Sequence, residues 1–169
     1  MIIFLDIDGV LNSGAWFDEN PGALGDFPVG HLDPAAVARL ERIVATTGAR
    51  IVISSSWRHG GSPLLGPGGR RLGSDRERTY IAIEALLRER GAPSALVVGQ
   101  TALFSGHTRA WQILCWLDEH FAVEKRPPFV VLDDDPKAYV CAHFVRISAD
   151  VGLTDPDADD AIAVLTRPG

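Results

Sequence analysis

A chain of 169 residues is long enough to form one domain with a substantial hydrophobic core. Hydrophobic residues make up 46% of it and charged residues 22%, as in soluble globular proteins, and no apolar run approaches the length of about 18 residues that suggests a membrane span. The formal net charge of −6 argues against bulk electrostatic attraction to nucleic acid, although it leaves room for a local basic groove.

The first predicted elements are a strand and a helix joined by an irregular segment. The wholly apolar run at 2–5 predicts a strand buried on both faces. Residues 12–33 carry Gly, Pro, Asn and Asp and predict a flap-like loop. Asp33 followed by Pro34 is a typical helix start, and the apolar stripe that follows predicts a helix that ends at Gly48.

The middle of the chain repeats this alternation. A second buried strand is predicted at 49–54, and a long glycine-rich loop at 59–75. A helix is expected over 76–90, because apolar residues recur there and a glycine follows. The segment 94–99 predicts a third strand, and 108–121 predicts an amphipathic helix.

The last elements complete a regular pattern. Strands are predicted at 129–133 and 142–148, and Thr154 begins a final short helix in the manner of a capping box. Strands and helices therefore alternate along the chain. This order predicts an α/β fold of three layers, with a central parallel sheet of about five strands, helices on both faces, and one domain over 1–169.

The two cysteines carry information about the compartment. Cys115 and Cys141 have neither metal-binding nor disulfide spacing and lie in or beside apolar segments, so we expect buried free thiols in a reducing compartment. The N-terminus lacks the basic region and the long apolar stretch of a secretory signal. We therefore expect a cytoplasmic location and no membrane partner.

Polar clusters follow three of the predicted strands directly. They are Asp6 with Asp8, the serine run 54–56, and the aspartate run 133–135. In open parallel sheets, ligands bind at the carboxyl ends of the strands. We therefore expect these three clusters to meet at one edge of the sheet. The alternative interpretation of each aspartate alone is a turn residue or a helix cap.

The chemistry of such a cluster is restricted. Carboxylates packed together are costly unless a cation compensates them. Oxygen ligands without His or Cys suit a hard cation, and Mg²⁺ is the expected one. A carboxylate-bound Mg²⁺ beside another carboxylate and hydroxyl donors is suited to phosphoryl chemistry, in which one aspartate acts as the nucleophile.

These motifs resemble those of a known superfamily. "FLDIDGVL" resembles the first motif of the haloacid dehalogenase superfamily, "IVISSS" its second and "VVLDDD" its fourth. Together with "SSSWR", "WLDEH" and "GLT", they resemble the small domains of this superfamily in Swiss Army Knife RNA repair proteins. The resemblance covers nearly the whole chain and implies a Rossmannoid fold.

The resemblance also implies catalytic and metal-binding roles. Asp6 would be the nucleophile that becomes phosphorylated, and Asp8 the general acid and base. Asp6, the backbone carbonyl of Asp8, Asp133 and Asp134 would hold Mg²⁺, the last one either directly or through water. These roles imply a phosphatase that works through an aspartyl-phosphate.

The resemblance also implies phosphate-binding residues. They are Gly9 of the first motif and either Ser54 or Ser55, whose hydroxyl would hydrogen-bond the phosphate. Ser55 is slightly preferred, because the strand is expected to run through Ser54. Arg109 takes the place of the usual lysine of the third motif, and it is not equivalent to lysine as a phosphate ligand. The other candidate cations are Lys125 and Lys137.

Trp57 and Arg58 follow the serine motif and have two interpretations each. Trp57 either packs as a lid on the core or stands at the pocket, where it would stack on a base or form a wall. Arg58 either forms a surface ion pair or contacts the phosphate or the substrate. Both are candidates for substrate binding.

The spacing between motifs bears on specificity. The flap at 12–33 is too short for a folded cap domain, and residues 100–107 alone separate the third strand from the Arg109 helix, so the enzyme would be capless. An open site admits bulky phosphate monoesters, and we expect a nucleotide or a nucleic acid end. The alternative is a non-catalytic or phosphotransfer module that regulates or binds a partner. The oligomeric state stays open.

Overall fold

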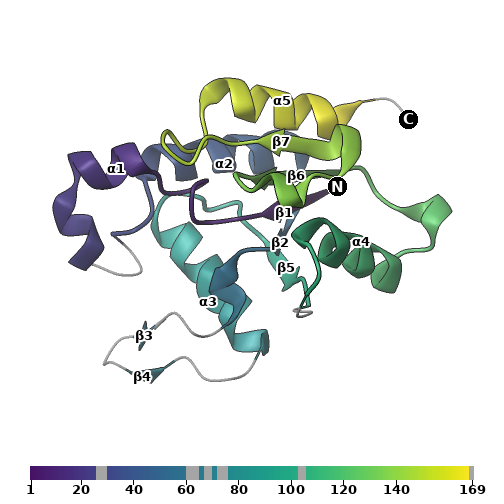
Figure 1. The fold of residues 1–169 in the computed structure, drawn as a ribbon, viewed down its shortest axis with the longest axis horizontal. Coiled ribbons are helices and arrows are strands. Elements are labelled where there is room, and N and C mark those ends of the chain that lie inside the picture. Colours follow the sequence, from purple (N-terminus) through teal and green to yellow (C-terminus); the bar gives the residue numbers. More distant parts are fainter. Residues whose placement is uncertain (26–29, 60–64, 67–69, 72–75, 103–105, 168–169) are drawn as a thin grey trace.

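A computed structural model describes residues 1–25, 30–59, 65–66, 70–71, 76–102 and 106–167 (Figure 1). Its centre is a parallel sheet of five strands in the order β5-β2-β1-β6-β7. The strands are β1 (Ile2–Leu5), β2 (Arg50–Ile53), β5 (Val97–Gln100), β6 (Phe129–Asp133) and β7 (Phe144–Arg146). The predicted α/β fold with a parallel sheet is confirmed.

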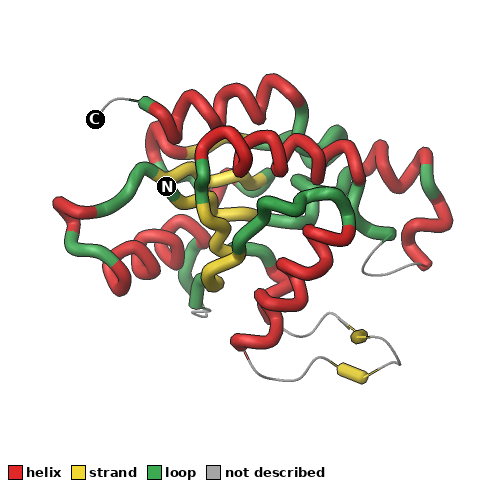
Figure 2. Tube along the Cα trace, turned by 180° about the vertical axis from the view of Figure 1, so that it is seen from behind, coloured by secondary structure: helices red, strands yellow, loops and turns green. Residues whose placement is uncertain are grey.

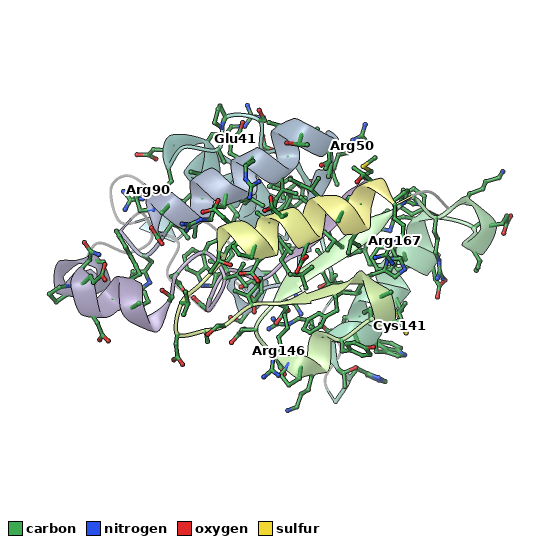
Figure 3. The ribbon with its side chains drawn as sticks, turned by 90° about the horizontal axis from the view of Figure 1, so that it is seen from above. Glu41, Arg50, Arg90, Cys141, Arg146 and Arg167 are labelled. Atoms are coloured by element: carbon green, nitrogen blue, oxygen red, sulfur yellow. The ribbon has the colours of Figure 1, made fainter. Side chains whose placement is uncertain are left out.

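Helices cover both faces of the sheet. Side chains from α2 (Pro34–Thr47), α3 (Arg76–Glu89) and α5 (Asp155–Thr166) share one hydrophobic cluster with one face. Side chains of α4 (Arg109–His120) form a second cluster with the opposite face. Figure 2 shows the strands of the central sheet between helices, and α5 lies beside α2 in Figure 3. The three-layer prediction is therefore also confirmed.

The alternation of side chains along β1 decides what faces α4. Ile3 and Leu5 belong to the cluster with α2, α3 and α5, whereas Ile2 and Phe4 belong to the cluster with α4. Because side chains alternate along a strand, the next residue, Asp6, continues the row that faces α4. The same alternation on β6 places Asp133 in that row. The carboxyl ends of β1 and β6 therefore carry polar side chains on the face that α4 covers.

The predicted helix ends agree with the structure. Asp33 caps α2 by accepting a hydrogen bond from the Ala35 amide (2.8 Å), and Gly48 ends that helix with a left-handed φ of 66°. Thr154 and Asp157 form the capping box of α5.

Two predicted loops contain ordered elements. Within 12–33, residues Gly14–Glu19 form the short helix α1 and Pro21–Gly25 a 3-10 helix, so a wholly irregular flap was a wrong prediction. The reason is local: the Ser13 hydroxyl caps α1 by accepting from the Trp16 amide (3.1 Å). Within 59–75, β3 (Leu65–Gly66) pairs antiparallel with β4 (Arg70–Arg71). Most of that glycine-rich loop lies outside the described residues.

Short 3-10 helices occupy several connections. They span Ser56–His59, Val123–Lys125, Pro136–Ala138 and Cys141–His143. Cys115 is half-buried, and Cys141, which is labelled in Figure 3, is exposed in the last of these turns. The expected burial of both thiols was therefore wrong. None of the described helices is long and apolar enough to cross a membrane.

Candidate active site

Two aspartates lie side by side at the carboxyl end of the central strands. Asp6 follows β1 and Asp133 ends β6, and the Asp6 amide donates to the Leu132 carbonyl (3.0 Å). Both residues are buried, at 4% and 0% exposure. With the half-buried Asp134 they offer three carboxylate oxygens within 4.8 Å of one another. This is a set of hard oxygen ligands that suits Mg²⁺.

Arg109 lies between the two buried aspartates. It is the first residue of α4, where Thr108 caps the helix by accepting from the Trp111 amide. Its Nη1 donates to Asp133 Oδ2 at 2.6 Å and also contacts Asp6 Oδ2. The structure therefore places this candidate phosphate ligand against both carboxylates, with its side chain only 18% exposed.

Burial and charge shift the acidities within this group. Burial, followed by the charge of Asp6, raises the pKa of Asp133 to about 7, although Arg109 acts in the opposite direction. The same two causes raise the pKa of Asp134. Burial would lower the pKa of Arg109, but the charges of Asp6 and Asp133 and the hydrogen bonds to them together raise it. The cluster therefore favours a cation or a proton.

The raised pKa of Asp133 predicts a pH dependence of the metal-free protein. Between about pH 4 and pH 7 the folded state binds more protons at Asp133 than the unfolded chain does. The free energy of unfolding in EDTA should therefore fall as pH rises through this window, by up to about 1.4 kcal/mol per pH unit. Urea unfolding at several pH values measures this, and Asp133→Asn should flatten the slope. An equal slope in that variant would contradict the prediction.

The two candidate serines differ in their surroundings. The strand β2 ends at Ile53, and the Ser54 amide donates to the Leu5 carbonyl (2.9 Å), which puts Ser54 level with Asp6. The Ser54 hydroxyl is fully buried without a hydrogen-bond partner in the described part of the chain. The Ser55 hydroxyl instead accepts from the Trp57 amide (3.2 Å). This geometry favours Ser54 as the hydroxyl available to a phosphate.

Asp8 stands outside the buried group but is held in place. Its side chain is exposed, and its Oδ1 accepts from Asn12 Nδ2 at 3.0 Å. Trp57 Nε1 donates to both carboxylate oxygens, at 3.0 and 2.9 Å. The structure thus brings Asp8 to the same strand end as Asp6, with its carboxylate fixed by two side chains.

Gly9 is required by both backbone and space. Its φ of 78° lies in the left-handed region, which a residue with a side chain rarely adopts. A Cβ at this position would come within 2.7 Å of Asp134 Cγ. Gly9 therefore lets the backbone after Asp8 approach the acidic group closely.

Trp57 and Arg58 are both buried, at 3% and 6% exposure. The Trp57 ring belongs to the main hydrophobic cluster, as the lid interpretation predicts, and its N–H reaches Asp8. Among the described residues, Arg58 forms no surface ion pair. Its Nη1 donates to the Ser55 carbonyl (2.6 Å) and contacts that of Ser54, and its Nη2 donates to Gln112 Oε1 (2.5 Å). Burial, then the charge of Arg109, lowers the pKa of Arg58 to about 10.

Three polar residues escaped the sequence analysis. Asn12 contacts Asp8, and Gln112 ties α4 to the serine turn through Arg58. Thr101 directly follows β5, level with Ser54, and its hydroxyl is also buried without a partner among the described residues. The position of Thr101 after an apolar strand was a signal that could have found it.

The fold and the acidic strand end define a domain of the haloacid dehalogenase type. The chain belongs to the family described as the HAD domain in Swiss Army Knife RNA repair proteins, whose model matches residues 2–158. The family suggested by the sequence motifs is therefore confirmed. Comparisons with curated proteins and with solved structures found no match.

Proposed function

We propose that this protein is a Mg²⁺-dependent phosphatase that hydrolyses phosphate monoesters through an aspartyl-phosphate on Asp6. The observation that carries the proposal is the arrangement around Asp6. Its buried carboxylate lies against Arg109 and in reach of the Asp133–Asp134 pair. It is level with Ser54, whose buried hydroxyl has no hydrogen-bond partner within the described ranges. A nucleophile, a cation and a hydroxyl donor are thus gathered at one strand end.

Each of these groups has a task in phosphoryl transfer. A carboxylate oxygen of Asp6 attacks phosphorus, and the bond from phosphorus to the leaving oxygen breaks. Asp8 gives its proton to that oxygen. Water then attacks the phosphorus of the aspartyl-phosphate and gives a proton to Asp8. The bond between phosphorus and the Asp6 oxygen breaks, which releases phosphate and returns both aspartates to their initial states. Arg109 and Ser54 bind the phosphate oxygens during both steps.

The donor set fits a magnesium ion. Asp6, Asp133 and Asp134 would hold it, together with the backbone carbonyl of Asp8, and the raised pKa of Asp133 is the expected property of carboxylates placed for a cation. When bound, Mg²⁺ neutralises phosphate charge and polarises the phosphoryl group.

The proposed substrate is a nucleotide or a nucleic acid end. The family description, which refers to RNA repair proteins, supports this class. The net charge of −6 favours a short substrate or an end over a long polyanion. The capless organisation, which would leave room for a bulky substrate, and the cytoplasmic location are parts of the same proposal.

The test is hydrolysis of an aryl phosphate by the wild-type protein, with Mg²⁺ and with EDTA. Turnover that requires Mg²⁺ is expected. No turnover would overturn the proposal and favour a non-catalytic or phosphotransfer module. A panel of 5′- and 3′-phosphorylated oligonucleotides, mononucleotides and sugar phosphates then identifies the substrate class. Preference for sugar phosphates would contradict the nucleic acid part alone.

A further inference from the structure

Trp57 presents one polar atom toward the site from an otherwise buried position. Its ring packs in the main hydrophobic cluster, and its Nε1–H faces Asp8. The two N–O distances, 2.9 and 3.0 Å, show a hydrogen bond shared by both carboxylate oxygens. Because the indole is held by packing, this donor has a fixed position in the fold.

A second buried donor holds the same carboxylate. Asn12 is 4% exposed, and its Oδ1 accepts from the Gly9 amide at 2.8 Å. The Gly9 amide is a donor only, so it fixes Oδ1 toward the backbone and leaves Nδ2 for Asp8 (3.0 Å). Gly9 donates this hydrogen bond from a turn in which its own φ is left-handed, at 78°.

Asp8 is exposed, whereas the two residues that donate hydrogen bonds to it are buried. An exposed aspartate that lacked partners would sample several rotamers. A general acid has to stand within hydrogen-bond reach of the leaving oxygen. Two buried donors on one exposed carboxylate restrict it to a single orientation.

From this we infer that Trp57 and Asn12 are positioning residues that aim Asp8 at the leaving oxygen. The inference rests on the proposed function, in which Asp8 passes its proton to that oxygen as the bond from phosphorus to oxygen breaks. It assigns to the Trp of the "SSSWR" motif a role in proton transfer rather than in stacking on a substrate base.

Neighbouring rings extend the support behind Trp57. The His31 ring meets the indole edge to face, with centroids 6.5 Å apart, and Phe17 of α1 meets His31 in the same way at 5.3 Å. The segment that carries α1 thereby contacts the ring that orients Asp8. The short helix after the first motif belongs to the same support.

The test is Trp57→Phe, which keeps a ring and removes the N–H. Single turnovers with enzyme in excess follow leaving-group release alone. The rate for phenyl phosphate, whose leaving oxygen needs a proton, should fall by about 10-fold or more, and that for 2,4-dinitrophenyl phosphate by less than about 2-fold. Equal losses for both substrates would overturn the inference, because a merely structural defect slows both alike.

Trp116→Phe is the matched control. Trp116 is also buried, but it packs against Phe4 and His120 in the other hydrophobic cluster. The ratio of the two single-turnover rates should be unchanged in this variant. The same change in ratio as in Trp57→Phe would contradict the assignment to Trp57.

A spectroscopic readout separates this inference from the proposed function. The indole N–H resonance of Trp57, assigned among the four tryptophans by its loss in Trp57→Phe, should shift in Asp8→Ala. An unchanged resonance would overturn the inference even in an active enzyme. If the resonance shifts in Asp8→Ala but the wild-type protein shows no turnover, the hydrogen bond between Trp57 and Asp8 is supported. The proposed phosphatase function would then be the part that is wrong.

Discussion

Asp6→Asn is expected to abolish turnover, with a loss of at least about 10³-fold, because the amide cannot act as the nucleophile. The fold should survive, since asparagine has nearly the same shape and keeps an oxygen for the Ile7 amide, which donates to Asp6 Oδ1 in the wild type (2.8 Å). Acid quenching of the wild type with radiolabelled substrate should trap labelled protein. The same treatment of Asp6→Asn should give none.

Asp18→Asn is the matched control for this variant. Asp18 is an exposed aspartate on α1, so the same change of charge there should leave turnover within about 2-fold of the wild type. Labelled protein in Asp6→Asn, or turnover comparable to that of Asp18→Asn, would show that another residue attacks phosphorus. Either result would contradict the assignment of Asp6 as the nucleophile.

The placement of Asp6 and Asp133 was predictable because it depends on the sheet alone. Both end apolar runs, and parallel strands bring their carboxyl ends together whatever the side chains around them do. Ser54 follows from the same rule once the end of β2 is known. The sequence could not fix that end to one residue, because strand boundaries depend on the ladder to β1.

The partners of Asp8 and Arg58 were not predictable in the same way. Trp57 meets Asp8 only because a 3-10 helix over Ser56–His59 folds the indole back toward the first motif. Arg58 meets Gln112 across the gap between two elements. Such contacts depend on rotamers and on packing between distant segments, which apolar periodicity does not record.

The helix α1 was missed for a different physical reason. It has six residues and buries none of its side chains, so it lacks the apolar stripe from which amphipathic helices are predicted. Its only sequence signal was the Ser13 cap. In a segment rich in Gly and Pro, that signal did not outweigh the composition.

Arg109→Leu is expected to destabilise the metal-free protein by on the order of 3 kcal/mol, because two buried carboxylates would lose the cation between them. Turnover should also fall by about 100-fold, since the phosphate would lose a positively charged donor. Mg²⁺ should restore part of the lost stability, because it would neutralise the same carboxylates. Urea unfolding in EDTA and in Mg²⁺ measures both effects.

Arg42→Leu provides the comparison that isolates burial. Arg42 also contacts two aspartates, Asp155 and Asp159, but its side chain is 40% exposed against 18% for Arg109. Water screens such a surface pair, so the same substitution there should cost at most about 1 kcal/mol and respond little to Mg²⁺. Equal loss of stability in the two variants, or no stabilisation of Arg109→Leu by Mg²⁺, would contradict the prediction that Arg109 and Mg²⁺ neutralise the same carboxylates. Recovery by Mg²⁺ in Arg109→Leu alone would tie the acidic strand end to the cation that phosphoryl transfer requires.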